Sequence, residues 1–109
     1  MRKTDKKLDN EIRKALTQAC EIALEQHTGF QWLTHIVNYD NFPASLRVIC
    51  VFATNQQLLA ANKTEITNLI TTKLGSINVP LKTPSKHISF DSEENCSVNH
   101  NGKWGDRLH

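Results

Sequence analysis

The stretch FDSEENCSVNHNGKW, residues 90–104, concentrates residue types that could bind a metal ion. Cys96 and His100 lie four positions apart, and a histidine and three carboxylates are close in sequence: His87, Asp91, Glu93 and Glu94. Zinc needs three or four ligands, usually from two tight Cys/His pairs, and only one loose pair is present. The carboxylates lack the spacing and the glycine of an EF-hand loop. The pattern therefore predicts no metal site and no cofactor, and we interpret it as the polar end of a small domain.

His35 could act as an acid or base if Asp40 or Tyr39 paired with it in the fold. A lone strand histidine is more often structural, and no second group with a matched role is visible in the sequence. The sequence contains no GxSxG nucleophile elbow, and its four glycines form no phosphate-binding loop. We therefore expect that the protein is not an enzyme.

Positive charge gathers at the N-terminus, although the formal net charge of the chain is only +2. The segment MRKTDKKLDNEIRK contains six basic and three acidic residues. Such a segment is either a solvated helix face or a surface that attracts an anion. Together with two later lysines it gives the candidate nucleic-acid contacts, which are Arg2, Lys3, Lys6, Lys7, Arg13, Lys14, Lys82 and Lys86.

Hydrophobic periodicity predicts the elements that position these residues. A helix is expected from about Thr4 to Gln26, with one apolar face made by Leu8, Ile12, Leu16, Ala19 and Ala23. Residues 30–39 are rich in aromatic and β-branched side chains, which predicts a strand. Residues 46–54 predict a second strand that is apolar on both faces and hence central in its sheet. The short connection between the two strands favours an antiparallel hairpin.

The rest of the chain completes an α+β pattern. Cap pairs at Thr54/Gln57 and Asn62/Glu65 make residues 54–75 either one kinked helix or two short ones. Residues 86–91 predict a third strand with a wet face. The order α-β-β-α(α)-β predicts a single domain over residues 1–92, whose small antiparallel or mixed sheet of three strands, with room for a fourth, packs on helices on one face. Residues 93–109 predict a polar tail that could fold back as a short hairpin at residues 101–102.

The aromatic residues leave two alternatives open. Trp32 and Ile36 share one face of the first predicted strand, and Leu33 and Val37 share the other. If helices cover only the second face, the first is either an apolar surface for protein binding or self-association, or is covered by Trp104 from the returning tail. The candidate interface residues are Trp32, Ile36, Phe42 and Trp104.

The three cysteines are an odd number without a CxxC pair. Cys20 and Cys50 lie in apolar stretches and should be buried, whereas Cys96 lies in a polar stretch where an exposed thiol is expected. This usage predicts reduced thiols and a cytoplasmic location. Neither a signal peptide nor a membrane span is predicted.

Two resemblances bear on function. The order α-β-β-α-α-β resembles the KH-type arrangement of some ribosome-associated proteins, without the GxxG loop that grips RNA in that family. The segments MRKTDKKLDNEIRKAL, GFQWLTHIVNYDNFPASLRVICVF and EENC resemble a family of small uncharacterised bacterial proteins, some labelled Fis-type transcriptional regulators. Residues 62–64 match the opening of the Fis helix-turn-helix, but no basic recognition helix follows. The second resemblance covers nearly the whole chain and implies no established activity.

The preferred hypothesis is therefore a non-enzymatic domain that binds a protein partner or a second copy of itself. The alternative is a nucleic-acid-binding protein, either a transcriptional regulator or a ribosome-associated factor, that uses its basic N-terminal helix. Neither hypothesis involves a membrane.

Overall fold

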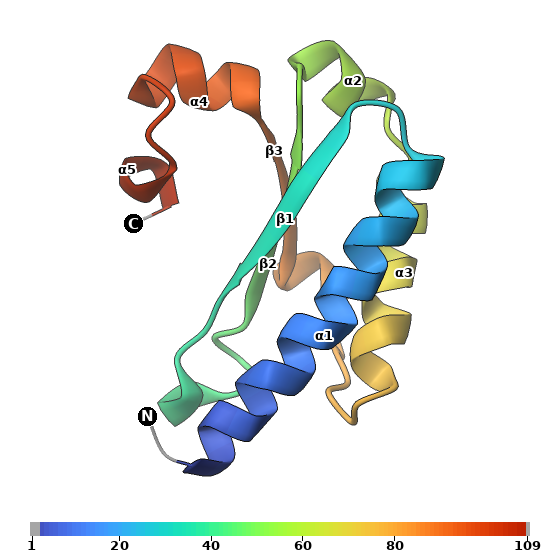
Figure 1. Ribbon diagram of the computed structural model, residues 1–109, viewed down its shortest axis with the longest axis vertical. Coiled ribbons are helices and arrows are strands. Elements are labelled where there is room, and N and C mark those ends of the chain that lie inside the picture. The colour runs from blue at the N-terminus through green and yellow to red at the C-terminus, as the bar shows by residue number, and fades with distance from the viewer. Residues whose placement is uncertain (1–2, 109) are drawn as a thin grey trace.

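The computed structural model describes residues 3–108, and its element order confirms the predicted α+β class (Figure 1). The six elements of the predicted order are α1 (Lys3–Gln26), β1 (Phe30–Ile36), β2 (Arg47–Phe52), α2 (Asn55–Ala60), α3 (Lys63–Gly75) and β3 (Ile88–Ser92). Two further helices follow, α4 (Glu93–His100) and α5 (Trp104–Leu108), and two 3-10 turns are η1 (Tyr39–Asn41) and η2 (Pro84–Lys86). No helix among these residues is long and apolar enough to cross a membrane.

The three strands form a mixed sheet in the order β1-β2-β3. β1 and β2 pair antiparallel, as the hairpin prediction required, and β2 and β3 pair parallel. A parallel pair needs a long crossover connection, which α2 and α3 provide here. Every residue of β2 from Val48 to Phe52 is buried, so its predicted central position is confirmed.

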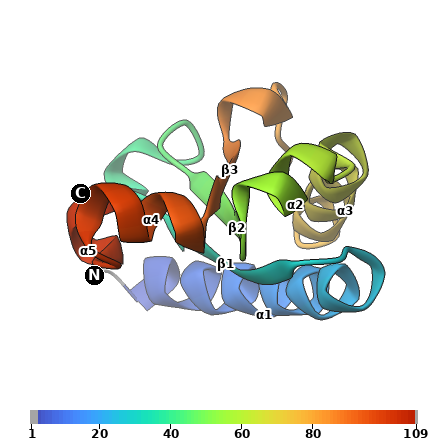
Figure 2. The same ribbon diagram turned by 90° about the horizontal axis from the view of Figure 1, so that it is seen from above.

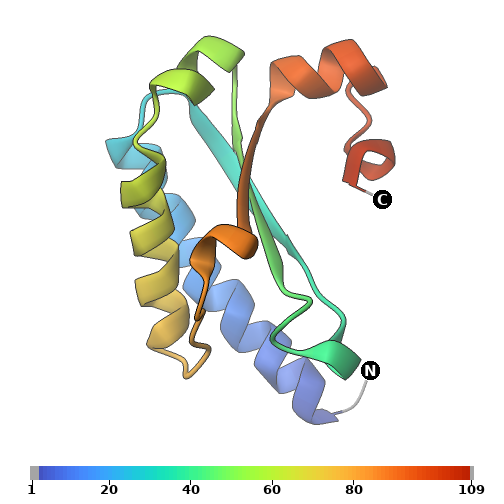
Figure 3. The same ribbon diagram turned by 180° about the vertical axis from the view of Figure 1, so that it is seen from behind.

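Both faces of the sheet are covered (Figure 2). α1 and α3 pack on one face, where the apolar stripe of α1 meets Phe52, Ile66 and Ile70 in the main core. α4 and α5 lie on the opposite side of the sheet, as the view from behind also shows (Figure 3). The expectation that helices cover only one face is therefore wrong, because the second face of β2 also carries buried apolar residues, Ile49 and Val51.

Local capping explains why residues 54–75 form two helices. The Thr54 side chain accepts from the Gln57 N–H at the start of α2, and the Asn62 side chain accepts from the Glu65 N–H at the start of α3. Between the two helices Ala61 adopts an extended backbone with ψ of 145°, which ends the first helix. Each cap satisfies a backbone donor that has no partner within its own helix.

The tail differs from its prediction. Ser92 ends β3 and caps α4, since its side chain accepts from the Asn95 N–H at 2.9 Å. Asn101 adopts a left-handed conformation (φ 52°) that ends α4, and the chain then turns into α5 instead of into a hairpin. Cys96 lies on α4 and is fully buried, so the expected exposed thiol is also wrong.

Candidate functional site

The predicted nucleic-acid contacts lie in two separate groups. Lys3, Lys6, Lys7, Arg13 and Lys14 are exposed on α1, which packs beside β1. Lys82 and Lys86 are exposed in and before η2, which packs beside β3 at the other edge of the sheet (Figure 2). Arg2 lies outside the described residues. The structure therefore brings the α1 lysines onto one helix but does not join them to the later pair.

Glu93 joins the two tryptophans. Its carboxylate accepts from the Trp32 indole N–H at 2.6 Å and from the Trp104 indole N–H at 3.0 Å. The two rings meet edge to face, with centroids 4.8 Å apart. Of the two alternatives that the sequence left open, the returning tail that covers Trp32 is confirmed.

A second contact fixes the tail to β3. The Arg107 guanidinium donates to both carboxylate oxygens of Asp91, and it also donates to His100 Nδ1 at 3.2 Å. Burial alone would raise the pKa of Asp91, but hydrogen bonds from Arg107 and the Ser92 backbone outweigh it and lower the pKa. The prediction that Asp91 lies on a solvent-exposed strand face is therefore wrong, because its carboxylate pairs with Arg107 of α5.

Five of the six candidate metal ligands have structural partners: Asp91, Glu93 and His100 through the contacts above, Glu94 through a hydrogen bond from the Asn55 backbone N–H at 2.8 Å, and His87. Asn55 accepts from the Ser92 hydroxyl at 2.6 Å and donates to the Asn95 side chain at 2.9 Å, which ties α2 to α4. The His87 ring lies 2.7 Å, through Nδ1, from the Leu46 carbonyl. Among residues 3–108, no group of three or more His, Cys, Asp or Glu side chains is placed to hold a metal ion.

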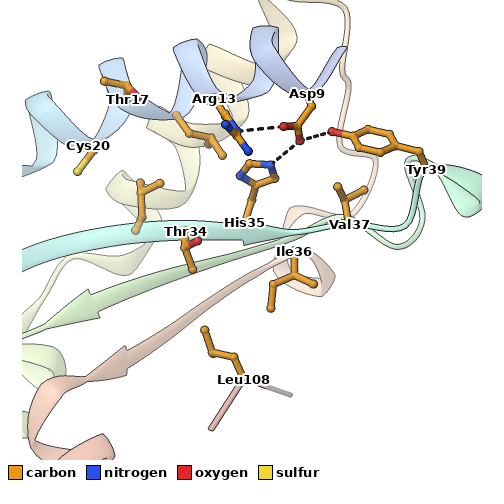
Figure 4. Close-up of a pocket in the computed structure, with 12 residues that line it drawn as sticks. Asp9, Arg13, Thr17, Cys20, Thr34, His35, Ile36, Val37, Tyr39 and Leu108 are labelled. Atoms are coloured by element: carbon orange, nitrogen blue, oxygen red, sulfur yellow. Dashed lines mark hydrogen bonds and ion pairs between the residues drawn. The ribbon is translucent and has the colours of Figure 1, made fainter. Parts of the chain in front are cut away.

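An open groove of about 790 Å³ lies between α1 and β1 (Figure 4). Five residues of α1 line it, namely Asp9, Arg13, Leu16, Thr17 and Cys20, and so do the five successive residues 33–37. Tyr39 and Leu108 complete the lining. Successive side chains of a strand point to opposite faces, so a groove that touches all five must pass over the edge of β1. Its volume is in the range of ligand sites in proteins.

Asp9 organises the polar end of this groove. Its side chain is nearly buried, with the residue only 8% exposed, and its Oδ1 accepts from the Tyr39 hydroxyl at 2.6 Å and from His35 Nε2 at 3.1 Å. Its Oδ2 lies 3.0 Å from Arg13 Nε. His35 is thus held by Asp9 and not by Asp40 or Tyr39 as the sequence suggested. The periodicity could have identified Asp9, because it lies one turn before Ile12 on the inward side of α1.

The pKa values of this cluster shift in opposite directions. Burial would raise the pKa of Asp9, but the hydrogen bonds from Tyr39 and His35, with the charges of His35 and Arg13, lower it overall. Burial and the hydrogen bond to Asp9 raise the pKa of Tyr39. Asp9 is therefore a carboxylate at neutral pH, and since three donors occupy it, it is poorly placed to take a proton from a ligand.

The edge of β1 that faces the groove has no neighbouring strand among the described residues. The Val48 N–H donates to the carbonyl of His87, the residue just before β3, at 2.7 Å. Because N–H groups along a strand alternate sides, Ile49 donates toward β1, where its partner is Thr34. Thr34 thus bonds inward, and Leu33 and His35 on either side of it direct their backbone groups outward, to the open edge.

The predicted interface residues separate into two roles. Trp32 and Trp104 contact each other under the tail, and Phe42 stacks near Tyr39 at a centroid distance of 5.7 Å while packing on the main core. Only Ile36 lines the groove. Sequence reasoning missed the groove because it is formed by α1 and β1 together.

A smaller cavity of about 440 Å³ lies where α1 ends and α3 begins. His27 Nε2 and Gln57 Oε1 are buried there without a hydrogen-bond partner, and His27 lies 3.5 Å from Glu65. The N-terminus of α3 could attract an anion to this cavity, but the Glu65 carboxylate, which lies in the first turn of α3 and lines the cavity, opposes that attraction. The α1–β1 groove is therefore the better-built site.

No protein-family model matches the chain, no curated protein matches its sequence, and no solved structure matches its fold.

Replacing Trp104 by alanine should uncover Trp32, because it removes the edge-to-face ring contact and one of two hydrogen bonds to Glu93. We expect the free energy of unfolding to fall by about 1–2 kcal/mol. The emission of the remaining Trp32 should shift to the red of that in Trp104→Phe, which keeps an aromatic ring in place. Identical emission maxima in the two variants would show that the tail does not cover Trp32.

Asp9→Asn should change how stability depends on pH. Asp9 has a lowered pKa in the folded state, so it stabilises the fold above the unfolded carboxyl pKa of about 4, and this contribution is lost as pH falls through the lower, folded value. We expect a loss of about 2 kcal/mol in urea unfolding at neutral pH that shrinks below about pH 4. Glu25→Gln, the same charge change on an exposed α1 site, is the control. Parallel pH curves for wild type and Asp9→Asn would contradict this role.

Proposed function

We propose that this protein is a non-enzymatic binding domain that captures an extended segment of a protein partner by strand addition to the open edge of β1. One observation carries the proposal: five successive residues, 33–37, line a single groove under α1. A peptide laid along this edge would pair with the outward N–H and C=O of His35, since the outward backbone of Leu33 already interacts with the Cys20 thiol, and its alternate side chains would enter the groove.

The lining residues support binding more than catalysis. The Asp9 carboxylate is occupied by three donors, so the groove lacks a carboxylate available for proton transfer. Burial raises the pKa of the Cys20 thiol, against a smaller lowering effect from the Leu33 backbone, which disfavours a reactive thiolate. The apolar side chains Leu16, Val37 and Leu108 are suited to contact with side chains of a polypeptide.

A second copy of the chain fits this edge less well than a separate segment. Antiparallel pairing of two β1 edges would place both copies of α1 on the same face of the joined sheet. Each α1 already forms a wall of the groove beside its own β1 edge. The two helices would compete for one space, whereas a single extended strand brings no helix with it. Self-association through β1 is therefore the weaker form of the hypothesis.

The proposal is tested with a random peptide library displayed on phage. Selected peptides should bind the purified protein, and NMR amide exchange should show new protection at His35 but little change at the inward-bonded Thr34. Ile36→Lys should weaken binding, since a charged side chain on an edge strand disfavours strand addition. Leu59→Lys on α2, which changes an apolar residue that is 79% exposed elsewhere, is the matched control.

Selection of no binding peptide would overturn the proposal. So would binders whose NMR shifts lie at α2 and α3 while β1 is unchanged.

A second candidate function is nucleic-acid binding, favoured by the α-β-β-α-α-β order and by the exposure of Lys3, Lys6, Lys7 and Lys14 on one helix. It would agree with the KH-type and regulator resemblances of the sequence. An RNA or DNA ligand would contact these side chains through its phosphates, so binding would weaken steeply as salt rises.

This candidate predicts that Lys3→Gln/Lys6→Gln/Lys7→Gln lowers affinity for single-stranded RNA or duplex DNA. The magnitude of the salt slope should fall by about 0.7–0.9 for each phosphate that the variant no longer neutralises. Lys82→Gln/Lys86→Gln, at the far edge of the sheet, should have little effect. The measurement is fluorescence anisotropy at low and physiological salt. Equal affinities and salt slopes for wild type and the triple variant would exclude the α1 surface.

We also propose that the protein works in a reducing compartment such as the cytoplasm. All three cysteines are free thiols, and burial raises the pKa of Cys50 to about 12. Such buried thiols are typical of proteins that do not depend on disulfides.

A further inference from the structure

We propose that the groove selects an extended segment that carries an aspartate or glutamate side chain, which pairs with the Arg13 guanidinium. This inference rests on the proposed strand addition and names the chemistry of its partner. It depends on the geometry of Arg13, on the charge balance of the groove and on the position of the open backbone groups.

Arg13 is held in place with part of its guanidinium unused. Its Nε lies 3.0 Å from Asp9 Oδ2, which orients the group beside His35 at the groove (Figure 4). Its two terminal nitrogens donate no hydrogen bond to another side chain or backbone group among residues 3–108, and its side chain is 69% exposed. An arginine fork can bind a carboxylate through two parallel hydrogen bonds, and the Asp9 contact reduces the conformational freedom that such binding would otherwise remove.

The charges around the groove favour an acidic occupant. Asp9 is the only acidic residue that lines the described groove, and Tyr39, His35 and Arg13 all interact with its carboxylate. The lining of the groove therefore presents the Arg13 guanidinium to an approaching segment, with one buried and already paired carboxylate beside it.

The backbone fixes where the acidic side chain would lie. The outward backbone of Leu33 already interacts with the Cys20 thiol. The outward N–H and C=O of His35 remain for a partner strand, and the His35 side chain shares Asp9 with Arg13. An acidic residue of a strand paired at His35 would thus be close to the Arg13 fork. A phosphate could also meet this fork, but the apolar groove wall and the strand edge favour a polypeptide.

The test uses the same random phage library, with the acidic residues of its selected peptides replaced one at a time by their amides. Selection should enrich aspartate or glutamate at one position, and the amide there should weaken binding to wild type about tenfold. Arg13→Gln should bind the acidic peptide about tenfold more weakly and no longer distinguish acid from amide. Arg13→Lys, which keeps the charge without the fork, should lie between these values.

Lys14→Gln is the matched control, since it removes the same charge from the next residue of α1 and Lys14 does not line the groove. Its affinity should change by less than about twofold. Peptides that bind at the β1 edge without acidic preference, with equal affinity for wild type and Arg13→Gln, would overturn this inference and leave strand addition intact. Tighter Arg13-dependent binding of single-stranded RNA than of any peptide would also overturn it. A library without β1-edge binders would instead remove the proposed function itself.

Discussion

The burial of β2 on both faces is the constraint on which the rest of the structure depends. Five successive residues, 48–52, have almost no exposed surface, and alternate side chains of a strand point to opposite faces. One layer of helices can cover only one of these faces. The chain therefore needs two covers, α1 with α3 on one side and the α4–α5 tail on the other (Figure 2). Polar residues hold the tail against this second face. Glu93 accepts hydrogen bonds from Trp32 and Trp104, and Asp91 accepts hydrogen bonds from Arg107.

The elements could be predicted from sequence because their determinants are local. The apolar stripe of α1, the β-branched runs of β1 and β2, and the caps at Thr54 and Asn62 each lie within a few residues of the structure they specify. The tail was harder, because its two short helices are fixed by contacts distant in sequence. Trp32 and Glu93 are 61 residues apart, and no periodicity links them. The polar sequence of the tail therefore suggested a loose hairpin. It also suggested that Cys96, which is buried, would be exposed.

The groove was not predictable for a related reason. Asp9, His35 and Tyr39 come from a helix, a strand and a turn, and only the antiparallel packing of α1 beside β1 brings them together (Figure 4). In the sequence Asp9 is one acid within a basic segment; periodicity could place it on the inward side of α1, but nothing in the sequence names its partners His35 and Tyr39. Burial gives Asp9 a different role, because a nearly buried carboxylate needs several hydrogen-bond or ion-pair partners. Arg13 is one of these partners, and the contact with Asp9 orients its guanidinium.

An open strand edge carries a risk of uncontrolled pairing between sheets, which proteins limit with charges or covering elements. Here α1 stands beside the open edge of β1 and places Arg13 along it. A second sheet with its own flanking helix would collide with this wall, whereas one extended chain could lie between α1 and Leu108. In the proposed complex the same arrangement would disfavour edge-to-edge pairing and leave room for a single strand. The groove beside this edge is the feature that motivates the proposed strand addition, because α1 packed directly over the edge would have protected it without leaving a groove.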